Sequence, residues 1–229
     1  MTDSVWAYDQ GKKDFRLFSS EQEWKDHITV CGAISYLKNH IQKSLKDDFY
    51  PAYEAYNSKG VGFFALPRII FPYITFLGTL LGGFSENAVD YMHIYLSKIN
   101  QTYRDKELCK FIYVVYRHGL AHTNMPKVAS ENGKIFGWQI SFDDTKHLCV
   151  YEGKGMGKAA ILSISPKKLA DEVISSIDEY IKDLQVKLEL FDRFKEGFVS
   201  MATTSHYIDK YKKKKLIVPA YIINSTDLG

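Results

Sequence analysis

The sequence has few cysteines and no hydrophobic leader. Its 229 residues include three cysteines that are far apart and never form a Cys-x-x-Cys pair: Cys31, Cys109 and Cys149. This spacing argues against a disulfide framework and against a thiolate metal site. The first residues also lack the basic and apolar segments of a secretory signal. We therefore expect a cytoplasmic protein in which Cys31 and Cys109 are small apolar core residues.

A marked excess of one charge is also lacking. The 30 basic residues are nearly matched by 27 acidic ones, so the formal net charge is +3. Such a balance does not identify a nucleic-acid-binding protein unless the basic residues are clustered. The most concentrated basic group consists of Lys210, Lys212, Lys213, Lys214 and Lys215. Two interpretations stay open: these lysines bind RNA phosphates beside Tyr207 and Tyr211, or they are simply solvated.

Only one long hydrophobic run is present. Residues 61–83 approach the length and apolarity of a transmembrane helix. However, Arg68 lies near the middle of the run, where a charge is costly in lipid, and Pro67 and Pro72 interrupt it. We therefore predict a buried helix and no stable membrane insertion. A hairpin that dips into a membrane is the alternative.

What the sequence does contain is the hydrophobic periodicity of helices. It predicts an amphipathic helix over 21–48 that ends or bends at Pro51, and a second helix over 61–83. The next helix has Ser85 as its N-cap, and the one after it is capped by Asp105 and ends at 121–124. A last long helix over 167–194 follows Ser165-Pro166. Short segments rich in β-branched and aromatic residues predict strands at 134–141, 146–151 and 160–165.

These elements define the predicted fold class. We expect a mainly α (α+β) protein, in which a helical bundle carries a small antiparallel β insertion at about 134–165, between the last two long helices. No repeat and no low-complexity linker divides the chain. Residues 1–202 are therefore predicted to form a single domain, followed by a basic C-terminal tail at 203–229.

The most specific functional signal is the segment Arg117-His118-Gly119-Leu120-Ala121-His122, at the end of an amphipathic helix. Four residues separate Arg117 from His122, and His118 directly follows the arginine. This pattern resembles the Arg-x4-His motif of the HEPN superfamily, a group of small helical proteins that includes many endoribonucleases and toxins. The resemblance covers the motif and, loosely, the helices around it. The predicted β segment is not part of the minimal family pattern.

The resemblance implies a metal-independent endoribonuclease, and the residue types suit this chemistry. RNA cleavage needs a base for the ribose 2′-OH, an acid for the leaving 5′-oxygen and a cation at the phosphate. Histidine exchanges protons near neutral pH, and the planar fork of arginine binds two phosphate oxygens. We expect Arg117 to hold the phosphate, His122 to act as acid or base, and His118 to orient or assist.

Helix geometry adds a condition. On a straight α-helix, residues five apart point in directions that differ by about 140°. Arg117 and His122 therefore converge on one phosphate only if the helix unwinds near Gly119 or if two subunits contribute. HEPN ribonucleases usually share a site across a dimer, so the resemblance implies a homodimer.

A different class of function stays open beside the ribonuclease. The same surface suits a non-catalytic dimeric module that binds a nucleotide, an RNA or a protein partner. In the simplest interpretation, Arg117 pairs with a carboxylate and His122 has a structural role.

Two other patterns are weaker. His118 and His122 are spaced so that both can face one metal ion, but no third ligand is spaced nearby. The segment 153–158 is similar to a phosphate-binding loop, yet Glu152 stands where the first glycine belongs and Ala159 stands in place of Ser or Thr. A hairpin tip is the preferred interpretation of this segment. We therefore expect no metal and no other cofactor.

Overall fold

The computed structural model describes residues 5–9, 14–83, 87–120, 126, 128–131, 134–152 and 159–202. Its internal contacts divide the chain into two compact units. One unit combines Met1–His27 with Phe198–Gly229, and the other comprises Ile28–Gly197. The second unit holds most of the helices and the whole four-stranded sheet.

The first unit contains a hairpin that the sequence analysis did not predict. Strands β1 (Val5–Asp9) and β2 (Asp14–Phe18) pair antiparallel, and α1 (Glu21–His27) follows them. The expected helix over 21–48 is therefore interrupted after His27. It resumes at Val30, where the Thr29 side chain accepts a hydrogen bond from the Gly32 N–H and caps the next helix.

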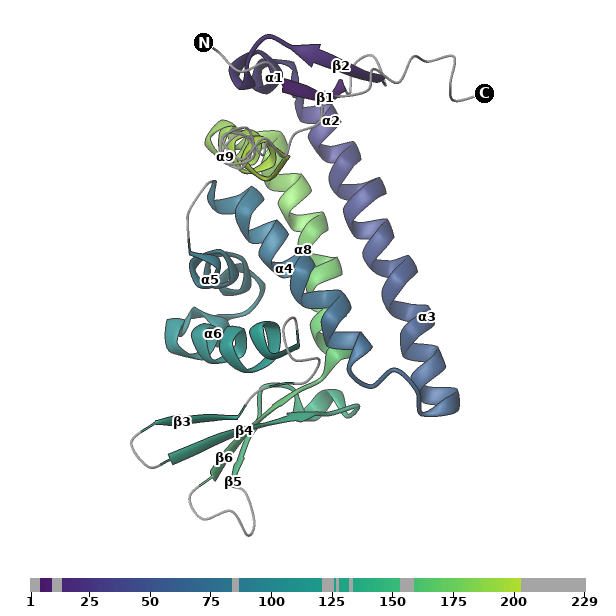
Figure 1. Ribbon diagram of the computed structural model, residues 1–229, viewed down its shortest axis with the longest axis vertical. Coiled ribbons are helices and arrows are strands. Elements are labelled where there is room, and N and C mark those ends of the chain that lie inside the picture. The colour runs from purple at the N-terminus through teal and green to yellow at the C-terminus, as the bar shows by residue number, and fades with distance from the viewer. Residues whose placement is uncertain are drawn as a thin grey trace, which may run out of the picture. The chain divides into compact units, whose positions relative to one another are not determined.

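One long helical run opens the second unit. The α-helix α2 (Val30–Ser35), the π-helical segment η1 (Tyr36–Gln42) and α3 (Lys43–Lys59) follow one another directly (Figure 1). Pro51 was expected to end or bend this helix. It does not end it, because the helix continues through Pro51 to Gly60, whose φ of 67° is left-handed. Pro51 has no N–H to donate to the carbonyl group four residues earlier. Because Pro51 is exposed, water can donate to that carbonyl group instead.

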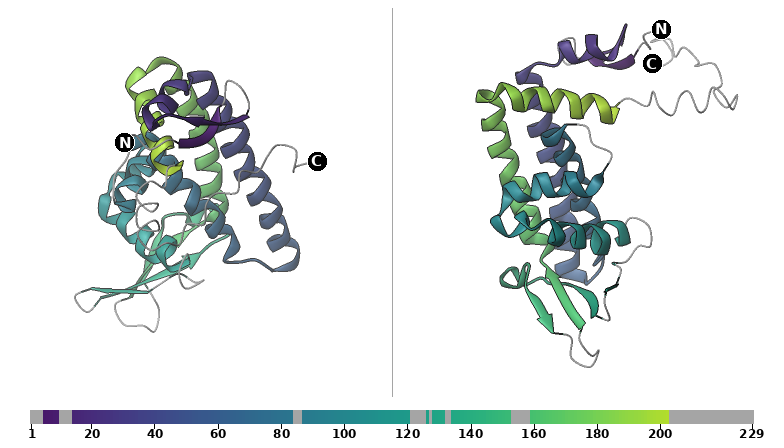
Figure 2. Two further views of the ribbon diagram at one scale, coloured as in Figure 1. Left: turned by 45° about the horizontal axis from the view of Figure 1, so that its top comes forward. Right: turned by 90° about the vertical axis from the view of Figure 1, so that its left-hand side faces the viewer.

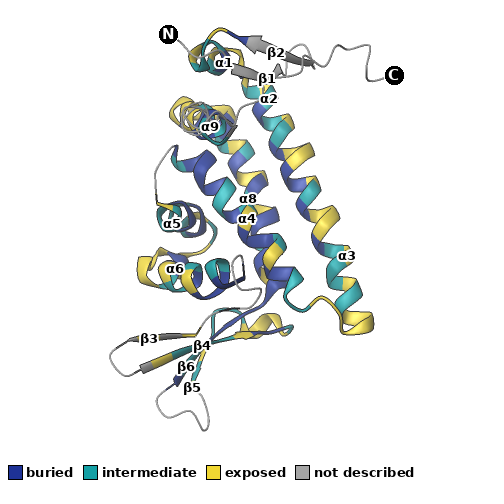
Figure 3. Ribbon diagram, viewed as in Figure 1, coloured by how far each residue is buried: buried dark blue, intermediate teal, exposed yellow. Residues whose placement is uncertain are grey.

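The apolar run forms α4 (Ala65–Gly82), which is a core helix as predicted. Residues along it are buried against its neighbours, and Figure 3 shows much of α4 as buried ribbon. Pro67 lies in the first turn, where a proline is tolerated. Among the described residues α4 alone is long and apolar enough to cross a membrane, a test that buried core helices also pass. This is consistent with the absence of stable membrane insertion.

Two glycines bring helix backbones unusually close to α4. A Cβ atom on Gly78 of α4 would lie 2.2 Å from the Tyr91 carbonyl oxygen of α5 (Ala88–Ile99). A Cβ atom on Gly197, in α9 (Leu188–Ala202), would lie 2.3 Å from the Thr79 carbonyl oxygen of α4. Because both neighbouring atoms belong to backbone, neither contact leaves room for a side chain.

The predicted helix caps are confirmed in two of three positions. Asp105 accepts hydrogen bonds from two backbone N–H groups at the start of α6 (Lys106–Ile112), directly after the short 3-10 helix η2 (Gln101–Arg104). Ser165 caps α8 (Pro166–Val186), with Pro166 in its first turn. The third prediction is wrong: α5 is capped by Asn87, and Ser85 lies outside the described residues.

The long helix predicted over 167–194 is two helices. Lys187 adopts an extended conformation, with φ −117° and ψ 97°, and α9 leaves α8 at a steep angle (Figure 2). No proline or glycine marks this break.

The prediction that Cys31 and Cys109 are core residues holds only in part, because Cys109 is buried whereas Cys31 is exposed.

A small sheet comes between the helices α6 and α8 in the sequence, as predicted. Its strands are β3 (Ala129–Glu131), β4 (Lys134–Ile140), β5 (Val150–Glu152) and β6 (Ala159–Ile164), with the short 3-10 helix η4 (Asp144–Lys146) after β4. The spatial order is β3-β4-β6-β5. Two pairings are antiparallel, as expected, but β4 and β6 run parallel, so the sheet is mixed. The fold is therefore mainly helical with a small β insertion.

Candidate functional site

The helix that carries the Arg117 motif changes its winding just before the motif. The α6 helix continues directly into the π-helical segment η3 (Tyr113–His118), and Gly119 and Leu120 return to α-helical conformation. In π-helical winding the hydrogen bonds join residues five apart, and such segments are frequent at functional sites. The helix therefore departs from α geometry over η3, just before Gly119, where unwinding was one of the two conditions for Arg117 and His122 to converge. His122 lies outside the described residues.

Tyr113 organises the two motif residues that the structure describes. The ring centroids of Tyr113 and His118, five residues apart, are 6.4 Å from each other. The guanidinium carbon of Arg117 lies 5.3 Å from the Tyr113 ring centroid, and Arg117 Nη1 is 3.5 Å from the Tyr113 hydroxyl. Tyr113 thus holds one half-buried cation and one half-buried histidine beside each other through cation–π and ring contacts.

Arg68 of α4 is tied to the motif helix at Leu120, two residues after η3. Its Nε atom donates a hydrogen bond of 3.2 Å to the carbonyl oxygen of Leu120. Nearby, the rings of Phe71 and Tyr116 stack with centroids 6.0 Å apart. The end of η3 is therefore anchored on α4 by one polar and one aromatic contact.

A hollow of ≈ 270 Å³ lies between these two helices, lined by Arg68, Phe71, Pro72, Arg117 and Leu120. Phe71 and Leu120 are 1% exposed and give it an apolar floor. Its two charged side chains are both arginines. Within the described part of the chain, neither arginine forms an ion pair with a carboxylate. The hollow therefore presents positive charge that the described residues do not neutralise, which suits an anion.

Tyr116 connects this helix to the β insertion. Its hydroxyl donates to the Leu162 carbonyl oxygen at 2.7 Å and lies 3.1 Å from the carbonyl oxygen of Gln139. These carbonyls belong to β6 and β4, the two parallel strands. Burial raises the pKa of Tyr116 far above its ordinary value, so the hydroxyl keeps its proton. The sheet thus supports the back of the motif helix.

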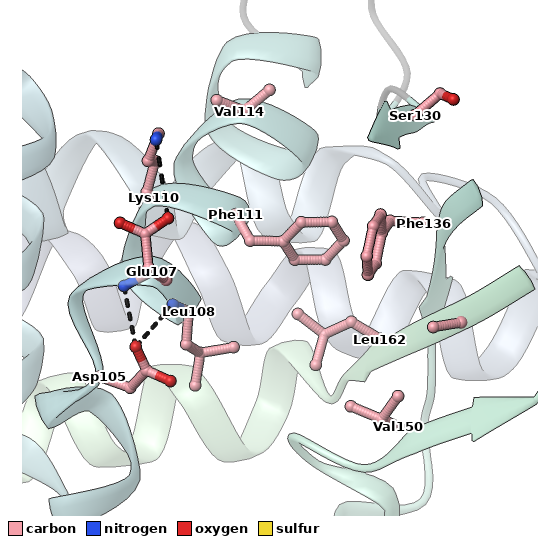
Figure 4. A pocket seen from close by; sticks show the side chains of 11 residues that line it. Asp105, Glu107, Leu108, Lys110, Phe111, Val114, Ser130, Phe136, Val150 and Leu162 are labelled. Atoms are coloured by element: carbon pink, nitrogen blue, oxygen red, sulfur yellow. Dashed lines mark hydrogen bonds and ion pairs between the residues drawn. The ribbon is translucent and has the colours of Figure 1, made fainter. Parts of the chain in front are cut away.

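A larger hollow of ≈ 520 Å³ opens between α6 and the sheet (Figure 4). Its floor is apolar, and Phe111 and Phe136 face each other edge to face with centroids 5.6 Å apart. Its charged groups already have partners, since Asp105 caps α6 and Lys110 lies 3.6 Å from Glu107. An apolar groove with such a rim offers no evident acid–base chemistry and no uncompensated charge.

A buried polar cluster lies at the start of α8. Tyr103 Oη is 2.7 Å from His147 Nε2 and donates to Glu172 Oε2 at 3.3 Å. His147 Nδ1 accepts a hydrogen bond of 3.1 Å from the Ser165 backbone N–H. In the neutral ring the proton is therefore on Nε2, and the donors run from His147 to Tyr103 to Glu172. Burial, and secondly the Glu172 charge, raise the pKa of Tyr103 well above its ordinary value.

The remaining candidate residues from the sequence are distributed as follows. The lysines 210–215 and the glycine-rich segment 153–158 lie outside the described residues. Another histidine, His93 of α5, has its Nε2 3.0 Å from the Arg104 carbonyl oxygen. Within the described ranges, no group of three or more His, Cys, Asp or Glu side chains is placed to hold a metal ion.

The sequence analysis missed two residues of the site, Arg68 and Tyr113. Arg68 was considered only as a charge that disfavours a membrane span. Arg68 is exposed, although it lies in an apolar core helix, and its place beside Arg117 depends on how α4 packs against η3. Tyr113 precedes Arg117 by four residues, a spacing that places both on one helix face.

Comparisons with known proteins provide no family assignment. No family model matches the chain, and no curated protein or solved structure is significantly similar to it.

Proposed function

We propose that this protein is a cytoplasmic, HEPN-like, metal-independent endoribonuclease with its site at the end of η3. The observation that carries the proposal is the position of Arg117. It lines a hollow beside a second arginine, and neither has a carboxylate partner among the described residues. A structural arginine of the kind considered in the sequence analysis would have such a partner. An unneutralised arginine in a hollow is instead typical of a phosphate-binding residue.

The proposed roles follow from the chemistry of RNA cleavage. The ribose 2′-OH loses its proton and attacks phosphorus, the bond from phosphorus to the 5′-oxygen breaks, and that oxygen gains a proton. A 2′,3′-cyclic phosphate and a free 5′-OH result, and no metal is required. Arg117 holds the phosphate oxygens, His122 transfers a proton, and His118, held beside Arg117 by Tyr113, orients the phosphate or assists.

A homodimer completes this proposal. With Arg117 from one subunit and His122 from the other, both groups reach one phosphate without further unwinding of the helix. Mixing Arg117→Ala protein with His122→Ala protein tests the arrangement, because subunit exchange then creates one site with both residues intact. Recovered cleavage in the mixture supports the shared site. Two inactive variants that stay inactive when mixed, although they exchange subunits, overturn it.

The catalytic claim is tested by RNA cleavage in EDTA. We expect the parent protein to cleave single-stranded RNA and Arg117→Ala to cleave about 10²–10³-fold more slowly, the usual loss when a transition-state charge partner is removed. Arg104→Ala is the matched control, since Arg104 is an exposed arginine of η2 outside the hollow. Circular dichroism and sedimentation show whether each variant keeps the parent's fold and oligomeric state.

The opposite result is equally informative. If the parent protein cuts no RNA, or if Arg117→Ala cuts as fast as the parent, the ribonuclease proposal is overturned. RNA binding without cleavage, lost in Arg117→Ala, instead supports the alternative: a non-catalytic dimeric module that uses the same surface to bind a nucleotide, an RNA or a protein partner.

A further inference from the structure

We infer that Arg68 and Arg117 form a two-arginine binding site for a single phosphate group, either free or part of a nucleotide chain. This inference deepens the proposed function, and only its consequence for catalysis rests on that function. Arg68 is not part of the Arg-x4-His motif. It comes from α4, about fifty residues earlier in the chain, and the fold brings it to the hollow.

The hydrogen bond between Arg68 and Leu120 leaves the phosphate-binding end of the guanidinium available. Only Nε is used, at 3.2 Å from the Leu120 carbonyl oxygen. This bond fixes the plane of the guanidinium, while its two terminal nitrogens have no hydrogen-bond partner among the described residues. Since an arginine presents five N–H donors, four remain for a ligand.

Arg117 belongs to η3, the other helical segment that lines the hollow, and an aromatic ring holds its guanidinium group. Its guanidinium lies against the Tyr113 ring, and the one polar contact that the described residues give it is the 3.5 Å approach of Nη1 to the Tyr113 hydroxyl. That contact is at the long limit of a hydrogen bond and is readily exchanged for a stronger one. Both arginines line the same hollow, and the oxygens of a tetrahedral oxyanion can accept hydrogen bonds from two planar forks.

The electrostatics of the hollow point to the same ligand. Two like charges face a space of ≈ 270 Å³, and its other lining residues among those described are Phe71, Pro72 and Leu120. The arginines repel each other and attract an anion, and water weakens both effects because Arg68 is exposed. A phosphate group relieves this repulsion. The volume is below the range typical of sites for drug-sized ligands, so it fits one small ionic group.

A second arginine has a specific consequence for RNA cleavage. The phosphodiester carries one negative charge in the ground state, and attack by the deprotonated 2′-oxygen adds a second. Two cations therefore complement the transition state better than they complement the bound substrate, which is the condition for catalysis. Removal of Arg68 should accordingly lower kcat more than it raises KM.

The experiment is titration calorimetry of the full-length protein with inorganic phosphate at constant ionic strength, with chloride as the reference anion. We expect saturable binding by the parent protein. The Kd should rise about tenfold or more in Arg68→Gln and in Arg117→Gln, as expected for lost hydrogen bonds to a charged group. Arg104→Gln, which changes the net charge equally, should bind phosphate like the parent. Arg68→Lys, which keeps the charge but loses the fork, should also bind more weakly than the parent.

A second arm uses a short single-stranded RNA oligonucleotide that competes with phosphate. Competition that depends on both Arg68 and Arg117 assigns the site to a nucleotide chain, whereas phosphate binding without competition assigns it to a free phosphate. Phosphate binding that is unchanged in a folded Arg68→Gln variant, or lost equally in Arg104→Gln, overturns the two-arginine site. Arginine-dependent phosphate binding without RNA cleavage overturns the ribonuclease and leaves the site established.

Discussion

The buried cluster around His147 and the hollow between Arg68 and Arg117 are polar regions of one helical unit, yet they are built in opposite ways. In the cluster, complementary groups meet: both ring nitrogens of His147 have partners, and the Tyr103 hydroxyl lies between His147 and Glu172. In the hollow, two groups of the same charge lie near each other, and the described residues provide no carboxylate for either.

This difference separates a structural role from a binding role. Buried polar groups are tolerated in a folded protein when their hydrogen bonds are satisfied, and a satisfied network then helps to fix one arrangement of the core. Positive groups left without a carboxylate partner among the described residues contribute little to folding and remain available to an anionic ligand. The cluster should therefore respond to mutation with a loss of stability, and the hollow with a loss of binding.

The largest expected effect on stability comes from His147→Ala. The substitution removes the acceptor of the Ser165 N–H and the partner of the Tyr103 hydroxyl, and it leaves a cavity beside the N-cap of α8. We expect the free energy of unfolding to fall by about 2–4 kcal/mol, measured by urea denaturation at neutral pH. Phosphate binding by the folded variant should be unchanged.

His93→Ala is the matched control for this prediction. The contact of His93 with the Arg104 carbonyl oxygen is exposed, so its removal should cost less than about 1 kcal/mol. Equal losses of stability in the two variants would show that the buried cluster around His147 stabilises the fold no more than an exposed histidine contact does. A loss of phosphate binding in folded His147→Ala would show that the two regions are coupled.

A smaller effect is expected for Tyr103→Phe at alkaline pH. Because the pKa of Tyr103 is raised in the folded protein, its hydroxyl ionises there at higher pH than in the unfolded chain, where the pKa is about 10. Above that pH the unfolded chain binds fewer protons, so this contribution to stability, complete below pH 10, is lost as the pH rises. Between the two pKa values the free energy of unfolding therefore falls as the pH rises. Removing the Tyr103 hydroxyl should make this fall less steep by up to about 1.4 kcal/mol per pH unit. Urea denaturation at a series of pH values from 9 to 11 measures it, and an unchanged slope contradicts the prediction.

The sequence was sufficient to predict the fold class because its strongest signals are local. The periodicity of the apolar residues, the cap at Asp105 and the Ser165-Pro166 start each act within one or two helical turns. Pro51 and Lys187 show the limit. The first is tolerated on an exposed helix face, and the second interrupts a helix without any residue that marks the break. The exposure of Pro51 depends on how α3 packs against other helices, which the local sequence does not specify, and nothing in the structure explains the break at Lys187.

The candidate site shows the same limit. Arg117 and His118 were found because their spacing lies within a single helix. Arg68 was missed because its relation to Arg117 exists only after α4 packs against η3. The parallel pairing of β4 with β6 was missed for the same reason, since local alternation does not specify the order of strands.

The smallest expected effect on stability, and the sharpest test of the contrast, comes from neutralising the arginines of the hollow. Without phosphate, Arg68→Gln and Arg117→Gln should each change the free energy of unfolding by no more than about 0.5 kcal/mol, because the lost contacts are partly exposed and the repulsion between the arginines is relieved. Phosphate at about 100 times its Kd should stabilise the parent protein by about 2.7 kcal/mol, as linkage requires, and the variants much less. Urea denaturation with and without phosphate measures both quantities. A loss above about 1.5 kcal/mol without phosphate would place these arginines with His147, as groups that hold the fold together, because a cation whose removal destabilises the free protein already has its partner within the chain.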